Sequence, residues 1–423
     1  MVSDRYDAVV VGASLAGCAT AIQLGRSGAS VALVEKSPDS GSFKRTCSHF
    51  IQAGTIPTLE RLELLEPIMA SGGVRSRFRA RMPQGWIDPP PDPAGYAVNL
   101  RRELLDPLVR EAAASTPGVE LMLGRPAVSL LSEGGAVRGV AVEGPDGTEA
   151  RLHAQLVVGA DGRDSRIAEL AGVKEKTLPH GRFAYGAYYE GVLPPGAPDA
   201  TAWMMDPEWA AAFPTDSGLV FYGAMPTKDR LPEFKRGSEK ALVAYLESMP
   251  DPPPIREAKR VSPIVGKIEM PNRIRGPIAP GLALVGDAAL AADPLFGVGC
   301  GWAFQSGEWL ADSVAPALRG AEPLKRGLAR YRRRHWLRIR PHAFQVNGYS
   351  TGRPFDASER MLFTAAVRDP KVAAAFDAFG TRRTSPPRAM ARAVPRAIVV
   401  NARHALRGRR EDSSPDGTRS TLA

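Results

Sequence analysis

A glycine-rich turn near the amino terminus has the residue types and spacing that hold a dinucleotide. Residues 12–17 read GASLAG, a GxGxxG pattern with serine at the middle glycine position. In this pattern the first glycine allows a tight turn, a small middle residue lets the backbone approach a pyrophosphate, and the last glycine lets a helix pack on a strand. Glu35 lies 18 residues beyond Gly17, where a carboxylate binds a ribose hydroxyl. The pattern favours binding of NAD or FAD over a merely tight turn.

Two further motifs place an aspartate shortly after an apolar segment. Residues 159–165 (GADGRDS) follow Leu152–Val158, and residues 286–289 (GDAA) follow Leu282–Val285. The second motif leads into a glycine-rich loop, DPLFGVGCG at 293–301. Ligands bind at the carboxyl ends of strands in open α/β sheets, and glycines before a helix expose N–H groups that could face the electron-rich edge of a flavin. Together, in this order and spacing, the three motifs are specific.

The elements that must position these motifs alternate between strand and helix. Tyr6–Gly12 and Ser30–Glu35 are short apolar runs typical of buried strands, and Leu15–Gly25 between them is rich in Ala and Leu, as a helix is. This order is a βαβ unit and predicts a parallel sheet. From about 177 to 266, aromatic-rich strand patterns separated by Pro and Gly predict another, mostly antiparallel layer. From Pro323 onward the pattern is mainly helical.

With these motifs, the whole chain resembles the class A flavoprotein monooxygenases, the group typified by para-hydroxybenzoate hydroxylase. The motifs look like that group's dinucleotide fingerprint, DG motif and GD motif. The match is close over 1–175 and 265–318, topological between them, and loose after about 320. The resemblance implies an α/β fold: a Rossmann-like FAD-binding domain, an inserted, mostly antiparallel β domain for the substrate, and a helical carboxyl-terminal region. The expected boundaries are 1–176 and 266–318 for the FAD-binding domain, 177–265 for the substrate layer, 319–410 for the helical region and 411–423 for a disordered tail.

The resemblance also implies roles for individual residues around FAD. Gly12, Ser14 and Gly17 would contact the pyrophosphate, and Glu35 the adenosine ribose. The other roles fall to Arg45 at the phosphates or adenine side, Arg102 at a helix start, Ala127 beside the adenine, Asp287 on the ribityl chain, Asp161 where nicotinamide and flavin meet, and Pro294, Gly297, Val298 and Gly299 along the isoalloxazine ring. The expected cofactor site further includes Leu15, Ala16, Lys36 and Gly286. Surface salt bridges are the alternative role for Arg45 and Arg102.

The loop at 293–296 departs from the hydroxylase pattern. Asp-Pro-Leu-Phe stands where hydroxylases more often have two prolines or His-Pro, and this form is similar to flavin-dependent halogenases and geranylgeranyl reductases, which share the fold. The halogenase WxWxIP signature is absent, since no two of the six tryptophans are two positions apart. Residues 45–47 (RTC) only hint at the cysteine loop of the reductases.

The implied reaction is hydroxylation or epoxidation of an aromatic or polyketide-like small molecule, as in secondary metabolism, with NAD(P)H and O2 and through a flavin C4a-hydroperoxide. The sequence has no second fingerprint for a nicotinamide, which agrees with transient docking of NAD(P)H and equally with a separate flavin reductase as partner. The alternatives are a reductase of the geranylgeranyl-reductase type, a halogenase fed by a partner reductase, and a non-catalytic partner-binding protein of the same fold. Intact Glu35, Asp161 and Asp287 argue against the last alternative.

The sequence does not name a general acid or base. Hydroxylation of a phenol would favour one whose pKa lies near the working pH. His49, in the loop near the expected flavin, and Asp293, the acid nearest the expected ring, are candidates, although Asp293 could simply cap a turn. Buried tyrosines in a sheet more often pack with a bonded hydroxyl. The candidates of the β layer are His180, Tyr185, Tyr188, Tyr189 and Tyr222.

Composition limits the remaining possibilities. The 423 residues are 44% hydrophobic and 24% charged, which is ordinary for a globular protein. No apolar run reaches the length of a membrane-spanning helix and no leader pattern precedes the first strand, so we expect a cytoplasmic protein. The cysteines, Cys18, Cys47 and Cys300, form no CxxC pair, which argues against a metal site or a disulfide framework.

Positive charge is concentrated near the carboxyl terminus. The chain carries a net charge of +10, and residues 319–410 hold 20 Arg and 2 Lys against 5 acidic residues. We interpret these cations as solvated helix faces rather than a nucleic-acid site, because no nucleic-acid motif accompanies them. The helices expected at 328–340, 370–379 and 389–407 would cover the site or form a homodimer contact. A basic helix at 388–410 could touch a membrane, but its apolar face is short, which favours docking on the protein.

Overall fold

A mainly parallel sheet carries all three motifs at the carboxyl ends of its strands. The computed structural model describes residues 4–47, 49–144 and 146–412. Val11 lies opposite Val34 and Gly159, and Gly159 lies opposite Leu284, so the three motifs leave the sheet side by side. The strand order is β20-β21-β11-β1-β2-β8, with β9 and β10 joined to β11 by antiparallel pairing. These strands are β1 (Arg5–Val11), β2 (Val31–Val34), β8 (Val119–Met122), β9 (Ala127–Glu133), β10 (Ala136–Glu143), β11 (Glu149–Gly159), β20 (Ile278–Ala279) and β21 (Leu282–Leu284).

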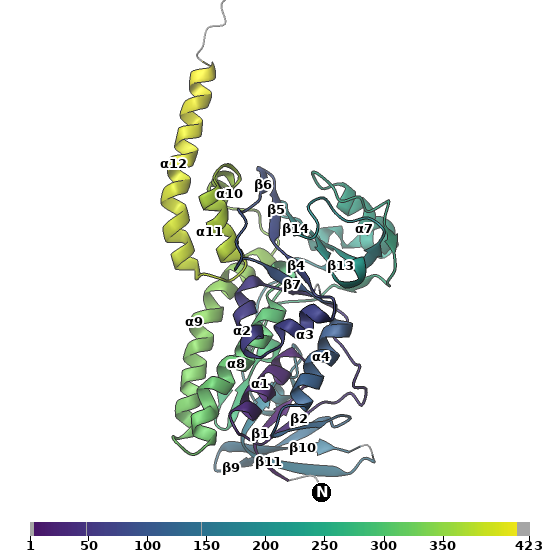
Figure 1. The fold of residues 1–423 in the computed structure, drawn as a ribbon, viewed down its shortest axis with the longest axis vertical. Helices are drawn as coiled ribbons and strands as arrows, with labels where there is room; N and C mark the ends of the chain where they lie inside the picture. Colours follow the sequence, from purple (N-terminus) through teal and green to yellow (C-terminus); the bar gives the residue numbers. More distant parts are fainter. Residues whose placement is uncertain (1–3, 48, 145, 413–423) are drawn as a thin grey trace, which may run out of the picture.

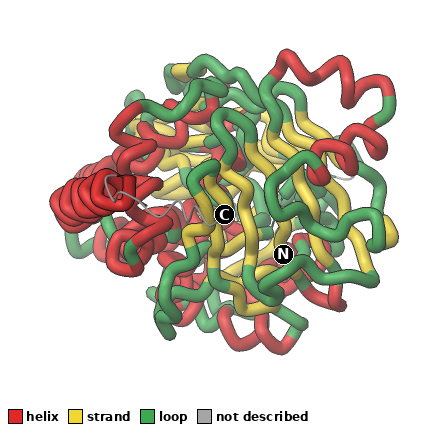
Figure 2. Tube along the Cα trace, turned by 90° about the horizontal axis from the view of Figure 1, so that it is seen from above, coloured by secondary structure: helices red, strands yellow, loops and turns green. Residues whose placement is uncertain are grey.

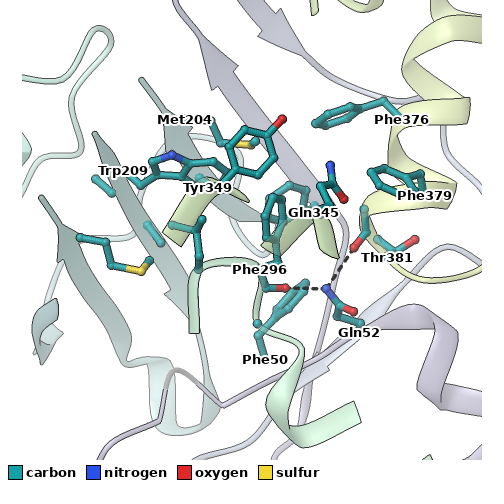
Figure 3. Close-up of a pocket in the computed structure, with 18 of the residues that line it drawn as sticks. Phe50, Gln52, Met204, Trp209, Phe296, Gln345, Tyr349, Phe376, Phe379 and Thr381 are labelled. Atoms are coloured by element: carbon teal, nitrogen blue, oxygen red, sulfur yellow. Dashed lines mark hydrogen bonds between the residues drawn. The ribbon is translucent and has the colours of Figure 1, made fainter. Parts of the chain in front are cut away.

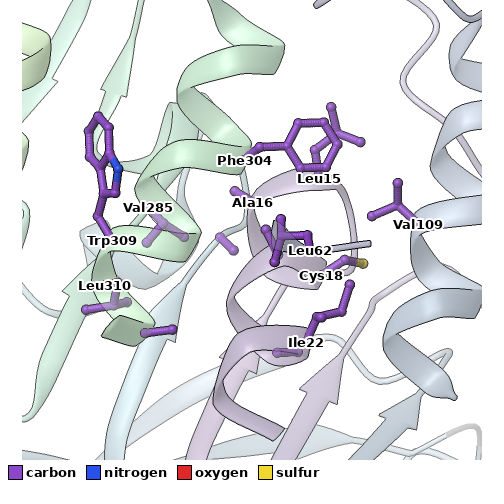
Figure 4. Close-up of a cluster of buried hydrophobic side chains, with 14 of the residues drawn as sticks. Leu15, Ala16, Cys18, Ile22, Leu62, Val109, Val285, Phe304, Trp309 and Leu310 are labelled. Carbon is purple, nitrogen blue, oxygen red and sulfur yellow. The ribbon is translucent and has the colours of Figure 1, made fainter. Parts of the chain in front are cut away.

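Three helices cover one face of this sheet (Figure 1). They are α1 (Leu15–Arg26), α4 (Arg102–Ala114) and α8 (Gly299–Leu318). The inward side chains of α1 and α8 form one apolar cluster with the sheet, in which Cys18, Ile22 and Phe304 are fully buried (Figure 4). Since α1 starts from the first motif and α8 from the third, this cluster fixes the two helix amino termini relative to each other.

A second sheet lies above the first and is mostly antiparallel (Figure 1). Its order is β17-β13-β16-β15-β14-β5-β6, with β18 beside β13. The sheet extends beyond the segment expected from sequence, because residues 78–87 supply two strands and β5 pairs in parallel with β14. Helices α6 (Leu231–Arg236) and α7 (Ser238–Glu247) cover one of its faces. The strands are β5 (Phe78–Met82), β6 (Gly85–Ile87), β13 (Ala184–Glu190), β14 (Ala200–Met204), β15 (Trp209–Pro214), β16 (Val220–Met225), β17 (Lys259–Arg260) and β18 (Val265–Lys267).

The carboxyl-terminal helices gather on one side of the two sheets (Figure 2). They are α9 (Leu324–Ser350), α10 (Ala357–Arg368), α11 (Pro370–Gly380) and α12 (Pro386–Asp412). The basic helix α12 packs on α10 and α11 through Ala393 and Ala397, and Arg396 pairs with Asp369. No helix in the described part of the chain is long and apolar enough to cross a membrane. The expected tail beyond Asp412 lies outside the described residues.

Short elements connect these layers. Two three-stranded sheets have the orders β3-β7-β4 and β12-β19-β22. The remaining strands and helices are β3 (Phe50–Ile51), β4 (Val74–Ser76), β7 (Ala97–Asn99), β12 (Glu175–Thr177), β19 (Arg273–Arg275), β22 (Leu290–Ala291), α2 (Ile56–Arg61), α3 (Leu65–Ala70) and α5 (Arg166–Leu170), with 3₁₀ turns η1 (Ala53–Thr55), η2 (Asp216–Gly218), η3 (Lys228–Arg230), η4 (Gly286–Ala288) and η5 (Pro294–Phe296).

Candidate active site

The turn between β1 and α1 accepts glycine alone at two positions. Gly12 has φ +107°, and a Cβ there would lie 2.6 Å from the carbonyl oxygen of Ala160. At Gly17 a Cβ would lie 1.8 Å from the carbonyl oxygen of Gly12. Helix α1 therefore begins in close contact with the end of β1. Ser14 is its N-cap residue, and its first turn contains no acidic residue. Free N–H groups and the positive end of the helix dipole are left for an anion such as a pyrophosphate.

Glu35 lies beside this turn at the end of β2. Its carboxylate accepts hydrogen bonds from the N–H groups of Ala13, over 2.9 Å, and Ser37, over 3.0 Å. The side chain thus holds the turn, and its position is also the one expected for a ribose contact. The adjacent Lys36 and Arg45 are exposed, and Ala127 begins β9 in a half-buried position.

Arg102 enters the same site from the start of α4, where it is buried. It donates a hydrogen bond to Ser14 Oγ over 2.9 Å and another to Asp106 Oδ1 over 2.8 Å. Burial opposes its charge, but Asp106, Cys47 and Cys300 together outweigh burial and raise the pKa of Arg102. The guanidinium is therefore a fixed positive charge at the first motif. Because Arg102 is buried, the alternative role in a surface salt bridge is excluded.

Lys44 links the loop after β2 to the third motif, a contact that sequence reasoning missed. Its Nζ lies 3.0 Å from Asp287 Oδ2, and its backbone N–H donates to Asp106 Oδ2 over 2.9 Å. The nearby Asp287 carboxylate raises the pKa of Lys44. The abundance of Lys and Arg in this loop was the available signal, but it did not single out Lys44.

Asp161 organises its own loop. Its carboxylate accepts from Ser165 Oγ over 2.6 Å and from the N–H of Ile167 over 2.9 Å. Arg163 in the same motif donates to the carbonyl oxygens of Pro271 and Ala292, over 2.6 and 2.8 Å. The second motif is thereby tied to the chain just before the glycine-rich loop.

The glycine-rich loop is shaped by Asp293. This carboxylate is fully buried, caps η5 by accepting from the N–H of Leu295 over 2.8 Å, and lies 2.8 Å from His180 Nε2. Gly297 follows with φ +61°, and α8 starts at Gly299 without an acidic residue in its first turn. Both oxygens of Asp293 are engaged in these two contacts, which supports the capping role over a catalytic one.

These residues fit FAD. Gly12 and Gly17 let α1 start close against β1, and the free amino termini of α1 and α8 suit the pyrophosphate and the pyrimidine edge. Arg102 adds a cation at the first motif, and Lys44 pairs with Asp287 at the third.

An apolar pocket lies where the η5 turn meets the second sheet, α9 and α11 (Figure 3). Gln52 crosses its edge and donates from Nε2 to the carbonyl oxygens of Phe296, over 2.6 Å, and Gly380, over 3.0 Å. The Tyr349 hydroxyl donates to Glu359 over 2.6 Å. The pocket's aromatic lining comes from Phe50, Phe78, Trp209, Phe213, Phe296, Tyr349, Phe363, Phe376 and Phe379.

The candidate bases of the β layer divide between the faces of the second sheet. Tyr185, Tyr189 and Tyr222 pack toward α6 and α7, on the face away from the pocket. Burial raises the pKa of Tyr222 and of Tyr189, which disfavours their ionised forms. Alternation along β13 turns Tyr188 to the other face, where its ring stacks on His49 with centroids 5.4 Å apart.

His49 is the buried imidazole nearest in sequence to the pocket, next to Phe50. Its Nδ1 accepts from the N–H of Arg102 over 3.0 Å, and its Nε2 is buried without a hydrogen-bond partner. The backbone at His49 has φ +60°, which a non-glycine residue rarely adopts. Two candidates therefore keep a buried ring nitrogen without a hydrogen-bond partner: Nε2 of His49, next to Phe50, and Nδ1 of His180, whose Nε2 contacts Asp293.

Comparison with known proteins agrees with this geometry. Residues 5–233, more than half of the chain, match the family described as FAD binding domain. A digeranylgeranylglycerophospholipid reductase of Methanothermobacter thermautotrophicus is 27% identical over 336 residues, which cover 78% of this chain and 83% of the relative.

Solved structures share the fold. The myxobacterial chondrochloren halogenase CndH superposes with a TM-score of 0.73 at 20% identity, covering 92% of this chain and 99% of that one. The p-nitrophenol 4-monooxygenase PnpA of Pseudomonas putida gives 0.70 at 21% identity, covering 91% and 100%. The expected kinship with class A flavoproteins is confirmed. The chain belongs to the FAD binding domain family and is an FAD-dependent oxidoreductase.

Proposed function

We propose that this protein is a monooxygenase that uses NAD(P)H and O2 to oxygenate an apolar aromatic or polyketide-like molecule. The observation that carries the proposal is the aromatic pocket against the Phe296–Gly297 turn, beside the expected isoalloxazine ring. FAD would supply the redox chemistry in this site. A pocket with this aromatic lining would favour an apolar substrate against the turn.

The chain's own residues divide the remaining work. The turn at 12–17 and the amino terminus of α1 bind the pyrophosphate, Arg102 fixes Ser14 at that turn, and Lys44 holds Asp287 in place for a ribityl hydroxyl. Gln52 ties the η5 turn to the end of α11, so that the pocket and the flavin-facing loop keep a fixed relation.

The pocket offers few groups that could transfer a proton. Among the described residues that line it, none is Asp, Glu, His, Lys or Arg. This lining suits epoxidation of an alkene or attack on an electron-rich ring that needs no deprotonation. For a substrate that must lose a proton, we propose His49 Nε2 as the acceptor, since it is buried and unpartnered and His49 adjoins the pocket residue Phe50, whereas His180 pairs with Asp293.

Reduction of an isoprenoid chain is the second candidate function. Matches to two digeranylgeranylglycerophospholipid reductases cover 78% and 75% of this chain, and a hydrocarbon lining would suit a long prenyl group. Such a reaction adds two hydrogen atoms to a double bond and incorporates no oxygen.

One experiment separates these reactions. The FAD-loaded protein is mixed without oxygen with NADPH or NADH in a stopped-flow instrument, and then with ¹⁸O₂ and a panel of aromatic, polyketide and prenylated compounds. We expect the flavin absorbance to bleach with a nicotinamide and one ¹⁸O atom to enter a product. A product that gains two hydrogens and no ¹⁸O would replace oxygenation by reduction. Flavin that no nicotinamide bleaches would point to a partner reductase, and failure to load FAD would refute the enzyme proposal.

A further inference from the structure

Two cysteines that are far apart in sequence meet at the flavin site. Cys47 lies in the loop after β2, Cys300 lies in the first turn of α8, and their Sγ atoms are 3.6 Å apart. A disulfide needs a sulfur separation of about 2.05 Å. Both cysteines are free thiols in the structure, so rotation of the two side chains must close the remaining gap.

The surroundings favour a thiolate at one of the two sulfurs. Arg102 Nη1 lies 3.7 Å from the Cys47 sulfur and 4.0 Å from that of Cys300, and the N–H of His49 donates to Cys47 Sγ over 3.4 Å. The hydrogen bond with Cys300 lowers the pKa of Cys47, and the same bond raises the pKa of Cys300. The pair is therefore asymmetric, with Cys47 as the nucleophile and Cys300 as the proton-bearing partner.

We propose that Cys47 and Cys300 form a peroxide-reactive site in which Cys47 is oxidised and Cys300 resolves the product to a disulfide. The Cys47 thiolate attacks one oxygen of hydrogen peroxide, the O–O bond breaks, and with one proton taken up this gives Cys47–SOH and water. The Cys300 sulfur then attacks the Cys47 sulfur, its proton leaves with the hydroxyl as a second water, and the S–S bond forms. Two thiols are oxidised, one peroxide is reduced to two waters, and a dithiol reductant reverses the result.

The disulfide would join the two segments that hold the flavin. The loop of Cys47 also carries Lys44, which pairs with Asp287, and α8 begins at the end of the glycine-rich loop. Oxidation also removes the thiolate that faces Arg102, the residue that positions Ser14. Peroxide would thus act on the cofactor site whichever substrate the protein uses.

Cys18 supplies an internal control. It is fully buried in α1, and burial raises the pKa of its thiol, so peroxide should leave it reduced. Alkylation under denaturing conditions counts the remaining thiols among the three cysteines.

The test uses the FAD-loaded full chain treated with hydrogen peroxide. We expect the number of alkylated thiols to fall from three to one, the intact mass before alkylation to fall by about 2 Da, and a Cys47–Cys300 peptide pair to appear in non-reducing digests. Cys18→Ala should go from two alkylated thiols to none. Cys47→Ser should keep two, and Cys300→Ser should accumulate a sulfenic acid at Cys47 that dimedone traps.

Three results would overturn the proposal. They are retention of all three thiols in the treated protein, oxidation of Cys47 to sulfinic acid with Cys300 still free, and a disulfide that includes Cys18. Because each readout is a mass or a thiol count, none depends on turnover of a substrate, and failure here leaves the proposed oxygenation intact.

Discussion

The hydroxyl of Ser14 accepts a hydrogen bond from the Arg102 guanidinium over 2.9 Å. This contact explains why the fingerprint tolerates serine at its middle glycine position. The side chain does not block the turn, and it engages a buried cation that Asp106 also holds. The proposed pyrophosphate site would therefore include a fixed positive charge from α4 in addition to the amino terminus of α1.

Ser14→Gly should weaken FAD binding even though it restores the common fingerprint. Loss of one hydrogen bond to a buried charge costs about 1.5 kcal/mol, which corresponds to about tenfold in Kd. The measurement is titration of the apoprotein with FAD, followed by quenching of flavin fluorescence. Ser14→Ala removes the hydroxyl without adding backbone freedom, and its Kd for FAD should equal that of Ser14→Gly. Tighter binding by the glycine variant would show that Arg102 does not act through Ser14.

Gly17→Ala should abolish FAD binding. The new Cβ would lie 1.8 Å from the Gly12 carbonyl oxygen, so α1 must move away from β1 and take its free N–H groups with it. Gly276→Ala is the matched control, because Gly276 is exposed and a Cβ there meets no atom within 4 Å. Thermal unfolding and FAD titration of both variants check the prediction. Normal FAD affinity in Gly17→Ala would contradict the assignment of this turn as the pyrophosphate site.

His49→Asn should slow turnover while keeping FAD bound. Asparagine tolerates the positive φ of this position, and its Oδ1 can accept the N–H of Arg102 in place of Nδ1. What it cannot do is exchange a proton, so we expect kcat to fall by about a hundredfold on a substrate that must be deprotonated. Steady-state kinetics across pH, with FAD occupancy measured by absorbance, provides the check. An unchanged kcat and pH profile would assign His49 a packing role against Tyr188.

The parts of the fold that local patterns determine could be predicted from the sequence. The apolar runs at β1, β2, β11 and β21 and the glycines at 12 and 17 leave little choice, because a βαβ unit needs buried strands and a tight turn. The strands β5 and β6 were not expected in the second sheet, since pairing with β14 joins residues more than 100 positions apart and no local pattern encodes it.

In the candidate site too, local patterns could be predicted from the sequence and long-range contacts could not. Period-two alternation separates Tyr188 from Tyr189 on opposite faces, but the sequence does not say which face meets the pocket. Lys44 and Asp287 pair across 243 positions, and Cys47 meets Cys300 across 253. Such contacts join segments that are distant in sequence, and only the assembled fold brings them together.

Ala211→Phe should block the pocket without disturbing the cofactor. Ala211 is buried on β15 and lies in a cluster with Phe50 and Phe213, so a benzyl group there would fill the space left for a substrate. We expect KM to rise by at least about tenfold, since loss of apolar contact surface weakens binding by about 1.4 kcal/mol or more, while the Kd for FAD stays unchanged. The KM of Ala211→Val should lie between those of the parent protein and Ala211→Phe. An unaltered KM in Ala211→Phe would place the substrate elsewhere.

Acid should destabilise this protein through His335 and His342 on α9. Burial, reinforced by Arg340, lowers the pKa of His335 to about 4, and burial, reinforced by Arg382, lowers that of His342 to about 3. In the unfolded chain both titrate near 6.5. Below that pH the two histidines are protonated in the unfolded state but stay neutral in the folded state. The free energy of unfolding therefore falls progressively from pH 6.5 down to pH 4 and below. At pH 5 each histidine should cost about 2 kcal/mol.

The corresponding measurement is the midpoint of thermal unfolding between pH 5 and 7. The double variant His335→Gln, His342→Gln should lose stability less steeply as pH falls, because glutamine does not titrate and can still accept the hydrogen bond that Arg382 gives His342 over 2.9 Å. His153→Gln, at an exposed position of β11, should keep the slope of the parent protein. Equal slopes in the double variant and the parent would mean that other groups, such as the carboxylates of surface ion pairs, govern the acid limb.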